Sequence, residues 1–165
     1  MQLMRPRLQS GFTFVEMVLV IAIIGIMVAI AIPALQSYIE RGRRAQAITD
    51  LQRMSDSLKK YERSTGILPD SMSAVPLDNV ATNPTLDTLR DPWSRPYEYF
   101  NLRTAHGNGQ ARKDKKLAPL NSDFDLYSVG PDGLTQASLG NSASRDDIVR
   151  ARDGGFIGTA EEFDP

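Results

Sequence analysis

The sequence predicts an α+β fold in which a long N-terminal helix, apolar at first and amphipathic later, packs on a small antiparallel β-sheet. An apolar run at residues 12–32 indicates the first part of the helix, and apolar residues spaced three and four apart indicate the second. Two later segments alternate apolar and polar residues, as half-buried strands do. With 165 residues, of which 41% are hydrophobic, the chain is long enough for one modest globular domain.

Composition excludes several classes of protein. The 19 basic and 20 acidic residues give a formal net charge of -1, which does not favour binding to nucleic acid by bulk charge. The chain has no cysteine and one histidine, His106, which excludes disulfides, iron–sulfur clusters, thiolate zinc sites and multi-histidine metal sites. Because the sequence also contains no phosphate-binding loop and no nucleophile elbow, we predict that the protein is not an enzyme.

The first element is a helix at residues 12–33 that can span a membrane. The apolar run is roughly 32 Å long at about 1.5 Å per helical residue, against about 30 Å for the hydrocarbon core of a bilayer. Gly25 and Pro33 weaken this helix, because an interior glycine costs about 1 kcal/mol and a proline removes a hydrogen bond. Two interpretations remain open here: the segment partly melts on assembly into a filament, or the helix simply kinks at Pro33.

Glu16 is the one charged residue in the apolar run, and three interpretations of the N-terminus treat it differently. A secretory signal peptide would need an apolar core about twice the usual 7–15 residues, with a carboxylate inside it. A plain signal anchor leaves Glu16 without a role. Cleavage between Gly11 and Phe12 would create an α-amino group, and in a bundle of helices Glu16 could neutralise the amine of a neighbouring subunit.

The amphipathic part of the helix covers residues 34–62, and Gly66 and Pro69 predict its end. The expected apolar positions are Leu35, Tyr38 or Ile39, Ala45, Ile48, Leu51, Met54 or Ser55, Leu58 and Tyr61. A helix with this pattern buries one face, so we expect it to pack against the globular head that follows.

The head is predicted to cover residues 63–165. Its prolines make residues 67–92 a loop with one short helical turn. The two predicted strands are residues 91–100 and 123–130, and a polar loop at 103–119 joins them.

The joining loop carries a cluster of basic residues, Arg112, Lys113, Lys115 and Lys116. Asp114 interrupts the cluster, and no aromatic residues are interleaved with it. We therefore predict a solvated loop rather than a phosphate-binding surface, and expect no nucleic-acid partner.

Residues 11–16, Gly-Phe-Thr-Phe-Val-Glu, with the apolar helix behind them, resemble the N-terminus of type IV pilins and type II secretion pseudopilins. The resemblance implies a leader at residues 1–11, which a prepilin peptidase removes by cutting between Gly11 and Phe12. It also implies N-methylation of Phe12, a role for Glu16 in assembly, and extraction of the mature chain from the membrane into a helical filament.

Segments 91–97 and 125–133 resemble the head of the major pseudopilin of type II secretion systems. This resemblance implies a structural subunit that polymerises into a periplasmic pseudopilus and drives protein export. The implied partners are further copies of this chain, minor pseudopilins, the prepilin peptidase, the inner-membrane assembly platform and the secretion ATPase. The chain would cross the inner membrane once, with its head in the periplasm.

Two other functions remain open at this point. A type IV pilin that serves adhesion, twitching motility or DNA uptake would share the same N-terminus. A membrane-anchored, calcium-dependent periplasmic enzyme would share the anchor, although the shortage of histidine and cysteine argues against it.

The resemblance to the major pseudopilin also implies a structural calcium ion in the loop after the second strand. Asp132, Asp146 and Asp147 match the acidic positions, and the backbone carbonyls of Val129 and Leu134 match the neutral ones. Calcium prefers six to eight oxygen ligands, which a looped chain can supply. In a chain without disulfides, such an ion would stabilise a head with a limited core.

A simpler interpretation of the same residues needs no metal. Asp132 and Gly133 would form a turn, and Asp146 and Asp147 would cap a helix that runs to Arg152. Asp153, a little further on, is either an additional ligand or a turn residue.

Overall fold

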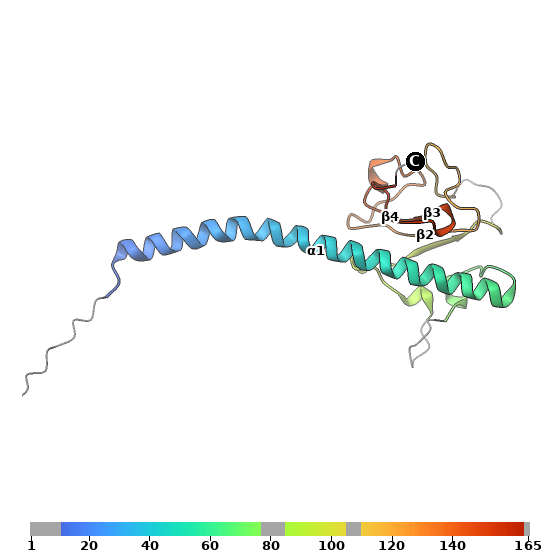
Figure 1. The fold of residues 1–165 in the computed structure, drawn as a ribbon, viewed down its shortest axis with the longest axis horizontal. Helices are drawn as coiled ribbons and strands as arrows, with labels where there is room; N and C mark the ends of the chain where they lie inside the picture. The colour runs from blue at the N-terminus through green and yellow to red at the C-terminus, as the bar shows by residue number, and fades with distance from the viewer. Residues whose placement is uncertain (1–10, 77–84, 105–109, 164–165) are drawn as a thin grey trace, which may run out of the picture. The chain divides into compact units, whose positions relative to one another are not determined.

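The structure is a computed structural model that describes residues 11–76, 85–104 and 110–163. Its largest element is α1, Phe14–Thr65, and four short strands follow it (Figure 1). The chain divides into two compact units, Met1–Glu40 and Arg41–Pro165, which are described separately below. His106 and the leader residues 1–10 lie outside the described residues.

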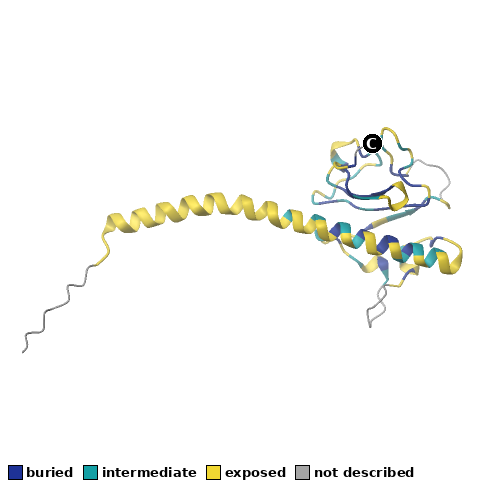
Figure 2. Cartoon of the chain, viewed as in Figure 1, coloured by how far each residue is buried: buried dark blue, intermediate teal, exposed yellow. Residues whose placement is uncertain are grey.

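The first unit contains the apolar part of α1, and its large side chains are exposed all round the helix (Figure 2). Ile21, for example, is 68% exposed and Ile30 is also 68% exposed. Within the part of the chain that the structure describes, α1 is the one helix long and apolar enough to cross a membrane. The backbone is helical through Gly25 and across Pro33, and melting on assembly stays a prediction.

The second unit begins with the amphipathic part of α1, which buries one face. Its buried residues are Ala47, Leu51, Met54, Ser55 and Leu58. The predicted stripe is confirmed at Leu51 and Leu58, whereas Ala45 is exposed and Ala47 takes the buried position. The helix continues to Thr65 and ends as predicted at Gly66, whose φ of 79° suits glycine and whose N–H donates to Glu62 O at 2.8 Å.

The strands form one antiparallel sheet in the order β1-β2-β3-β4. Their bounds are Glu98–Asn101 for β1, Phe124–Ser128 for β2, Ile148–Ala151 for β3 and Phe156–Thr159 for β4. The two predicted strands are confirmed as β1 and β2, although residues 91–97 form a turn and a bridge before β1 begins. Between α1 and β1, the described loop residues include two short 3-10 turns, Met72–Ala74 and Leu86–Thr88.

The prediction of a helix running to Arg152 is wrong, because residues 148–151 are strand β3 and Arg152 begins a 3-10 turn. All four residues of β3 are buried, so both faces of the strand are covered. A strand buried on both faces shows no alternation of apolar and polar residues, and Arg150 in the middle of it hides the pattern further.

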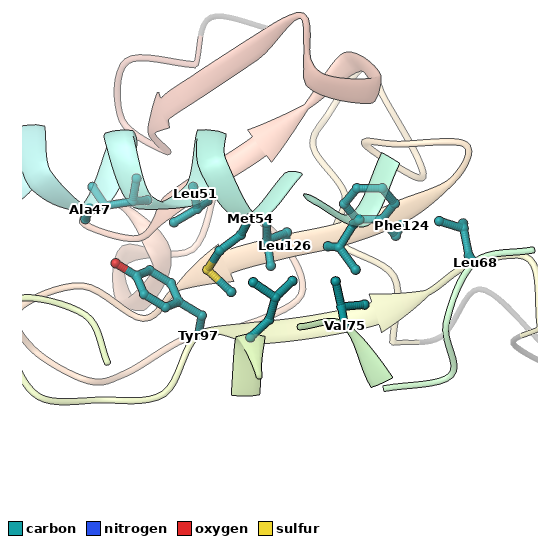
Figure 3. Close-up of a cluster of buried hydrophobic side chains, with 11 residues drawn as sticks. Ala47, Leu51, Met54, Leu68, Val75, Tyr97, Phe124 and Leu126 are labelled. Carbon is teal, nitrogen blue, oxygen red and sulfur yellow. The ribbon is translucent and has the colours of Figure 1, made fainter. Parts of the chain in front are cut away.

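Two clusters of buried side chains cover the two faces of the sheet. In the first, Leu51 and Met54 of α1 lie beside Leu126 of β2 (Figure 3). The second cluster lies on the other side of β3 and consists of Leu120, Leu139, Val149, Ala151, Ala160 and Phe163. The loops between β1 and β3 therefore cover the face of the sheet that α1 leaves open.

Candidate functional site: the start of α1 and the loop before β3

The predicted cleavage site lies in non-helical chain directly before α1. Gly11 and Phe12 are both exposed, and the Phe12 side chain is 77% exposed. The predicted cleavage position is therefore exposed and lies outside the helix.

Glu16 makes a reciprocal cap with Thr13 at the first turn of α1. Glu16 Oε2 accepts hydrogen bonds from the Thr13 N–H and from Thr13 Oγ1, each at 2.8 Å. The Glu16 N–H donates in turn to Thr13 Oγ1 at 3.2 Å. This is the capping box of a Thr-x-x-Glu sequence, a signal that was present in residues 13–16 and that our sequence interpretation missed. Glu16 thus has a role within its own chain as well as the predicted one between subunits.

The structure divides the three predicted carboxylate ligands of calcium rather than bringing them together. Asp132 and Asp146 lie side by side, because the Asp132 N–H donates to Asp146 Oδ2 at 3.1 Å. Asp132 Oδ1 is also used locally, as it accepts from the Leu134 N–H at 2.8 Å. Asp147 instead is fully buried and is bound by Arg112.

The residues of this loop do not fit a calcium ion as they are arranged. In residues 11–76, 85–104 and 110–163, no group of three or more acidic or histidine side chains lies close enough to hold one metal ion. Asp147 Oδ1 is a buried oxygen without a hydrogen-bond partner, but a single oxygen falls far short of the six to eight that calcium requires. Calcium binding stays a prediction that this geometry does not support.

Arg112 shows that one prediction for the basic cluster is wrong. Its side chain is only 3% exposed rather than solvated, whereas Lys113, Lys115 and Lys116 are exposed as expected. The Arg112 guanidinium lies 4.2 Å from the centre of the Tyr127 ring and forms an ion pair with Asp147. Nothing in the local run of charges distinguishes Arg112, because its partners come from distant segments.

Burial governs the protonation of the carboxyls on this side of the sheet. It raises the pKa of Asp147 to about 6, and the positive charge of Arg112 offsets only part of that rise. Burial also raises the pKa of Asp125, although Asn121 donates to one of its oxygens at 2.8 Å.

A second buried arginine, Arg150, joins α1 to the sheet. Its guanidinium donates to Asp123 Oδ1 at 2.8 Å and Oδ2 at 2.9 Å, and to Ser55 Oγ at 3.0 Å. Lys59 Nζ lies 2.6 Å from Asp123 Oδ2. Burial raises the pKa of Asp123, but the hydrogen bonds from Arg150 and Lys59 outweigh it and hold the pKa well below its usual range. Our sequence interpretation missed this network entirely.

Asp153 is a turn residue rather than a metal ligand in this arrangement. It has a left-handed backbone with φ of 55°, and its two carboxylate oxygens accept from the N–H and the hydroxyl of Ser122, each at 2.7 Å. These contacts attach the turn after β3 to the segment that leads into β2.

Gly130 offers a direct test of the loop geometry. Its φ is 67°, and a Cβ there would come within 2.5 Å of the backbone oxygen of Asp146. We expect Gly130→Ala to lower the free energy of unfolding by about 2 kcal/mol or more, from the strained backbone and the clash together. The control is Gly140→Ala, where the nearest atom is Ser138 Oγ at 3.8 Å. Urea unfolding curves that coincide for the two variants would contradict the loop geometry.

The comparisons with known proteins agree with these features. The family profile for the prokaryotic N-terminal methylation motif matches residues 6–32. The type II secretion system core protein G of Pseudomonas aeruginosa is 29% identical over 158 residues, which cover 84% of this chain and 98% of that protein. The core protein G of Vibrio cholerae is 26% identical over 155 residues, covering 83% and 94%.

Type IV pilins are also similar to the chain. A type IV major pilin protein of Neisseria gonorrhoeae is 28% identical over 160 residues, which cover 92% of this chain and 90% of the pilin. No solved structure gave a significant match. The methylation motif, the relatives that match over most of their length, and a helix packed on an antiparallel sheet agree with one another. Together they support the assignment of the chain to the pilin-like family, as a type II secretion pseudopilin of the core protein G kind.

Proposed function

We propose that the chain is cut between Gly11 and Phe12, and that the mature subunits assemble through the apolar part of α1 into a periplasmic pseudopilus. One observation carries this proposal: an exposed helix, apolar except for Glu16 in its first turn, directly follows an exposed, non-helical cleavage motif.

The physical reason is that the first unit has no interior of its own. Its apolar side chains stay exposed in the single chain, so they must be buried by lipid or by other protein. Before assembly the inner membrane covers them, and in a filament the same helices of neighbouring subunits would replace the lipid. Each transfer keeps the apolar surface away from water.

The remaining partners and the location follow from this assignment. The prepilin peptidase would process the leader, the assembly platform and the secretion ATPase would drive extraction, and minor pseudopilins would join the filament. The head would lie in the periplasm, with α1 as the single membrane anchor before assembly. We assign the chain no catalytic role, since its relatives are pseudopilins and pilins.

Deletion of the gene tests the proposed function. We expect exoproteins to accumulate folded in the periplasm and to disappear from the medium, because export across the outer membrane would lack its filament. The measurement is an immunoblot of one exoprotein in the periplasmic and extracellular fractions. Restoration by the unsubstituted gene is the positive control, and a gene encoding Gly11→Glu, which removes the cleavage site, is the matched negative control.

The alternative is a type IV pilin, and the similarity to the Neisseria gonorrhoeae protein favours it as a second candidate. It predicts normal export in the deletion strain, together with a loss of surface fibres, twitching motility or DNA uptake. That combination would contradict the pseudopilus proposal.

A further inference from the structure

We infer that two arginines, Arg112 and Arg95, hold the loop between β2 and β3 in the place where a calcium ion was expected. The head of this pseudopilin is then stable without calcium. The inference concerns the loop alone and does not depend on which filament the subunit builds.

Arg112 holds the buried side of the loop. Its guanidinium donates to Asp147 Oδ2, to Thr135 Oγ1 and, at 2.9 Å, to the carbonyl of Gln136. Thr135 Oγ1 donates to the same Asp147 oxygen at 2.6 Å. One cation therefore gathers a carboxylate, a hydroxyl and a carbonyl from two separate parts of the loop, which is what a bound metal ion does.

Arg95 holds the other side of the loop. Its guanidinium donates to the carbonyl of Gly130 and, at 3.2 Å, to the carbonyl of Pro131. Gly133 leaves room for it, since a Cβ there would lie 2.7 Å from Arg95 Cζ. The carboxylate of Asp91 fixes the backbone of Arg95. It accepts hydrogen bonds from the backbone N–H of Arg95 at 2.8 Å and from the hydroxyl of Ser128 at 2.6 Å.

The charge and the number of hydrogen-bond donors of the two arginines support their role in place of a calcium ion. Two guanidinium groups carry the two positive charges of a calcium ion, and each presents a planar set of N–H donors suited to carboxylates and carbonyls. The oxygens they bind come from residues 130–136 and from Asp147, so they enclose the loop from both sides. Among the predicted ligands Asp147 accepts from a guanidinium, so a calcium ion at that carboxylate would have to displace Arg112.

Hydrogen bonds also hold residues 136–144 of the loop between β2 and β3 without a metal ion. Ser144, which is fully buried, accepts from the Gln136 N–H at 2.8 Å and donates to the Gln136 carbonyl at 2.9 Å. The Lys113 N–H donates to Ala137 O at 2.9 Å, and the Leu139 N–H donates to Lys113 O at 3.0 Å. The segment that carries Arg112 thereby pairs with residues 137–139 of the loop through a bridge at Lys113.

The first test compares the thermal unfolding of the full chain in detergent micelles with calcium and with EDTA. Trp93, the single tryptophan, packs against the core and lies two positions before Arg95 in the sequence, so its fluorescence reports on the head. We expect the same Tm in calcium, in magnesium and in EDTA. A calcium site at a hundredfold excess over its Kd would raise Tm by roughly 10 °C, and such a calcium-specific rise would overturn the inference.

The second test removes the guanidinium. Arg112→Met keeps a long side chain but leaves Asp147 buried without its cation, and we expect Tm to fall by roughly 10 °C or more in calcium and in EDTA alike. Lys115→Met, an exposed change in the same basic cluster, is the matched control and should leave Tm unchanged. If Arg112→Met melts like the unsubstituted protein in calcium, the inference is wrong.

A double variant keeps the second test decisive if the single variant Arg112→Met fails to fold. Arg112→Met combined with Asp147→Leu removes both charges, and a buried ion pair replaced by apolar groups is close to neutral in stability. We therefore expect the double variant to fold and to regain most of the lost Tm. A double variant that folds only when calcium is added would refute the role of the arginines.

Discussion

Replacing Arg150 by methionine is expected to lower the free energy of unfolding of the head by about 3–5 kcal/mol. The side chain of Arg150 is fully buried and binds both oxygens of Asp123, which is itself only 2% exposed. Removing the guanidinium leaves the carboxylate in the interior with Lys59 as its remaining cation and the Phe124 N–H as a further donor. Urea unfolding followed by Trp93 fluorescence measures the loss.

Arg53→Met is the matched control, because Arg53 is exposed on the same helix and its loss should leave stability unchanged. The double variant Arg150→Met with Asp123→Leu should recover part of the loss, since no carboxylate is then buried unpaired. An Arg150→Met protein as stable as the Arg53→Met control would show that the buried network does not hold α1 on the sheet.

The pH dependence provides a second readout of the same network. The pKa of Asp123 is held below its usual range, so its contribution to stability is present above the unfolded pKa of about 3.9. That contribution is lost as the pH falls below this value, because the unfolded chain then takes up a proton that the folded carboxylate does not. We expect Arg150→Met to lose less stability than the unsubstituted protein between neutral pH and pH values below about 3.9.

Replacing Glu16 by glutamine is expected to leave leader cleavage intact and to reduce filament yield by about tenfold or more. Glutamine can still accept hydrogen bonds from Thr13 as part of a capping box, but it cannot neutralise the α-amino group of a neighbouring subunit. The measurement is an immunoblot for the processed chain together with the amount of sheared filament that sediments.

Thr13→Ala is the control that separates capping of the helix from pairing between subunits. It removes the hydroxyl that completes the cap but keeps the Glu16 charge, so filaments should form at close to the normal yield. Glu16→Ala removes both roles and should assemble no better than the glutamine variant. If the glutamine variant assembles normally, capping is the role of Glu16 and pairing between subunits is not.

The start of α1 could be interpreted from sequence because its determinants are local. The apolar run, Gly11, Phe12 and Glu16 lie within a few helical turns of one another, so their pattern survives without any knowledge of the fold. The same locality explains why Gly66 was found as the helix end, since a glycine with positive φ caps a helix through its own backbone.

The sheet could be predicted only in part, because its two faces are both covered. Phe124 and Leu126 alternate with polar residues as a half-buried strand would, yet Asp125 is only 1% exposed. Strand β3 was missed for the same reason, since Arg150 stands at a position that faces the core. Alternation predicts a strand only when one of its faces meets water.

The residues that bind one another across the head could not be paired in advance. Arg112 and Asp147 are separated by 35 positions, and Arg150 and Ser55 by 95, so no spacing rule connects them. Whether an arginine in a polar loop is solvated or buried depends on which carboxylate the folded chain brings to it, and that is a property of the tertiary structure.

The primary sequence was therefore sufficient to predict a helix able to span a membrane, a cleavage motif and the family, because these depend on contiguous residues and on hydrophobic periodicity. The packing of α1 on four strands, the capping role of Glu16 and the two buried arginine networks became apparent only in the folded chain. Desolvation is the physical reason: a buried charge must find a partner, and the fold alone decides which distant group lies within reach.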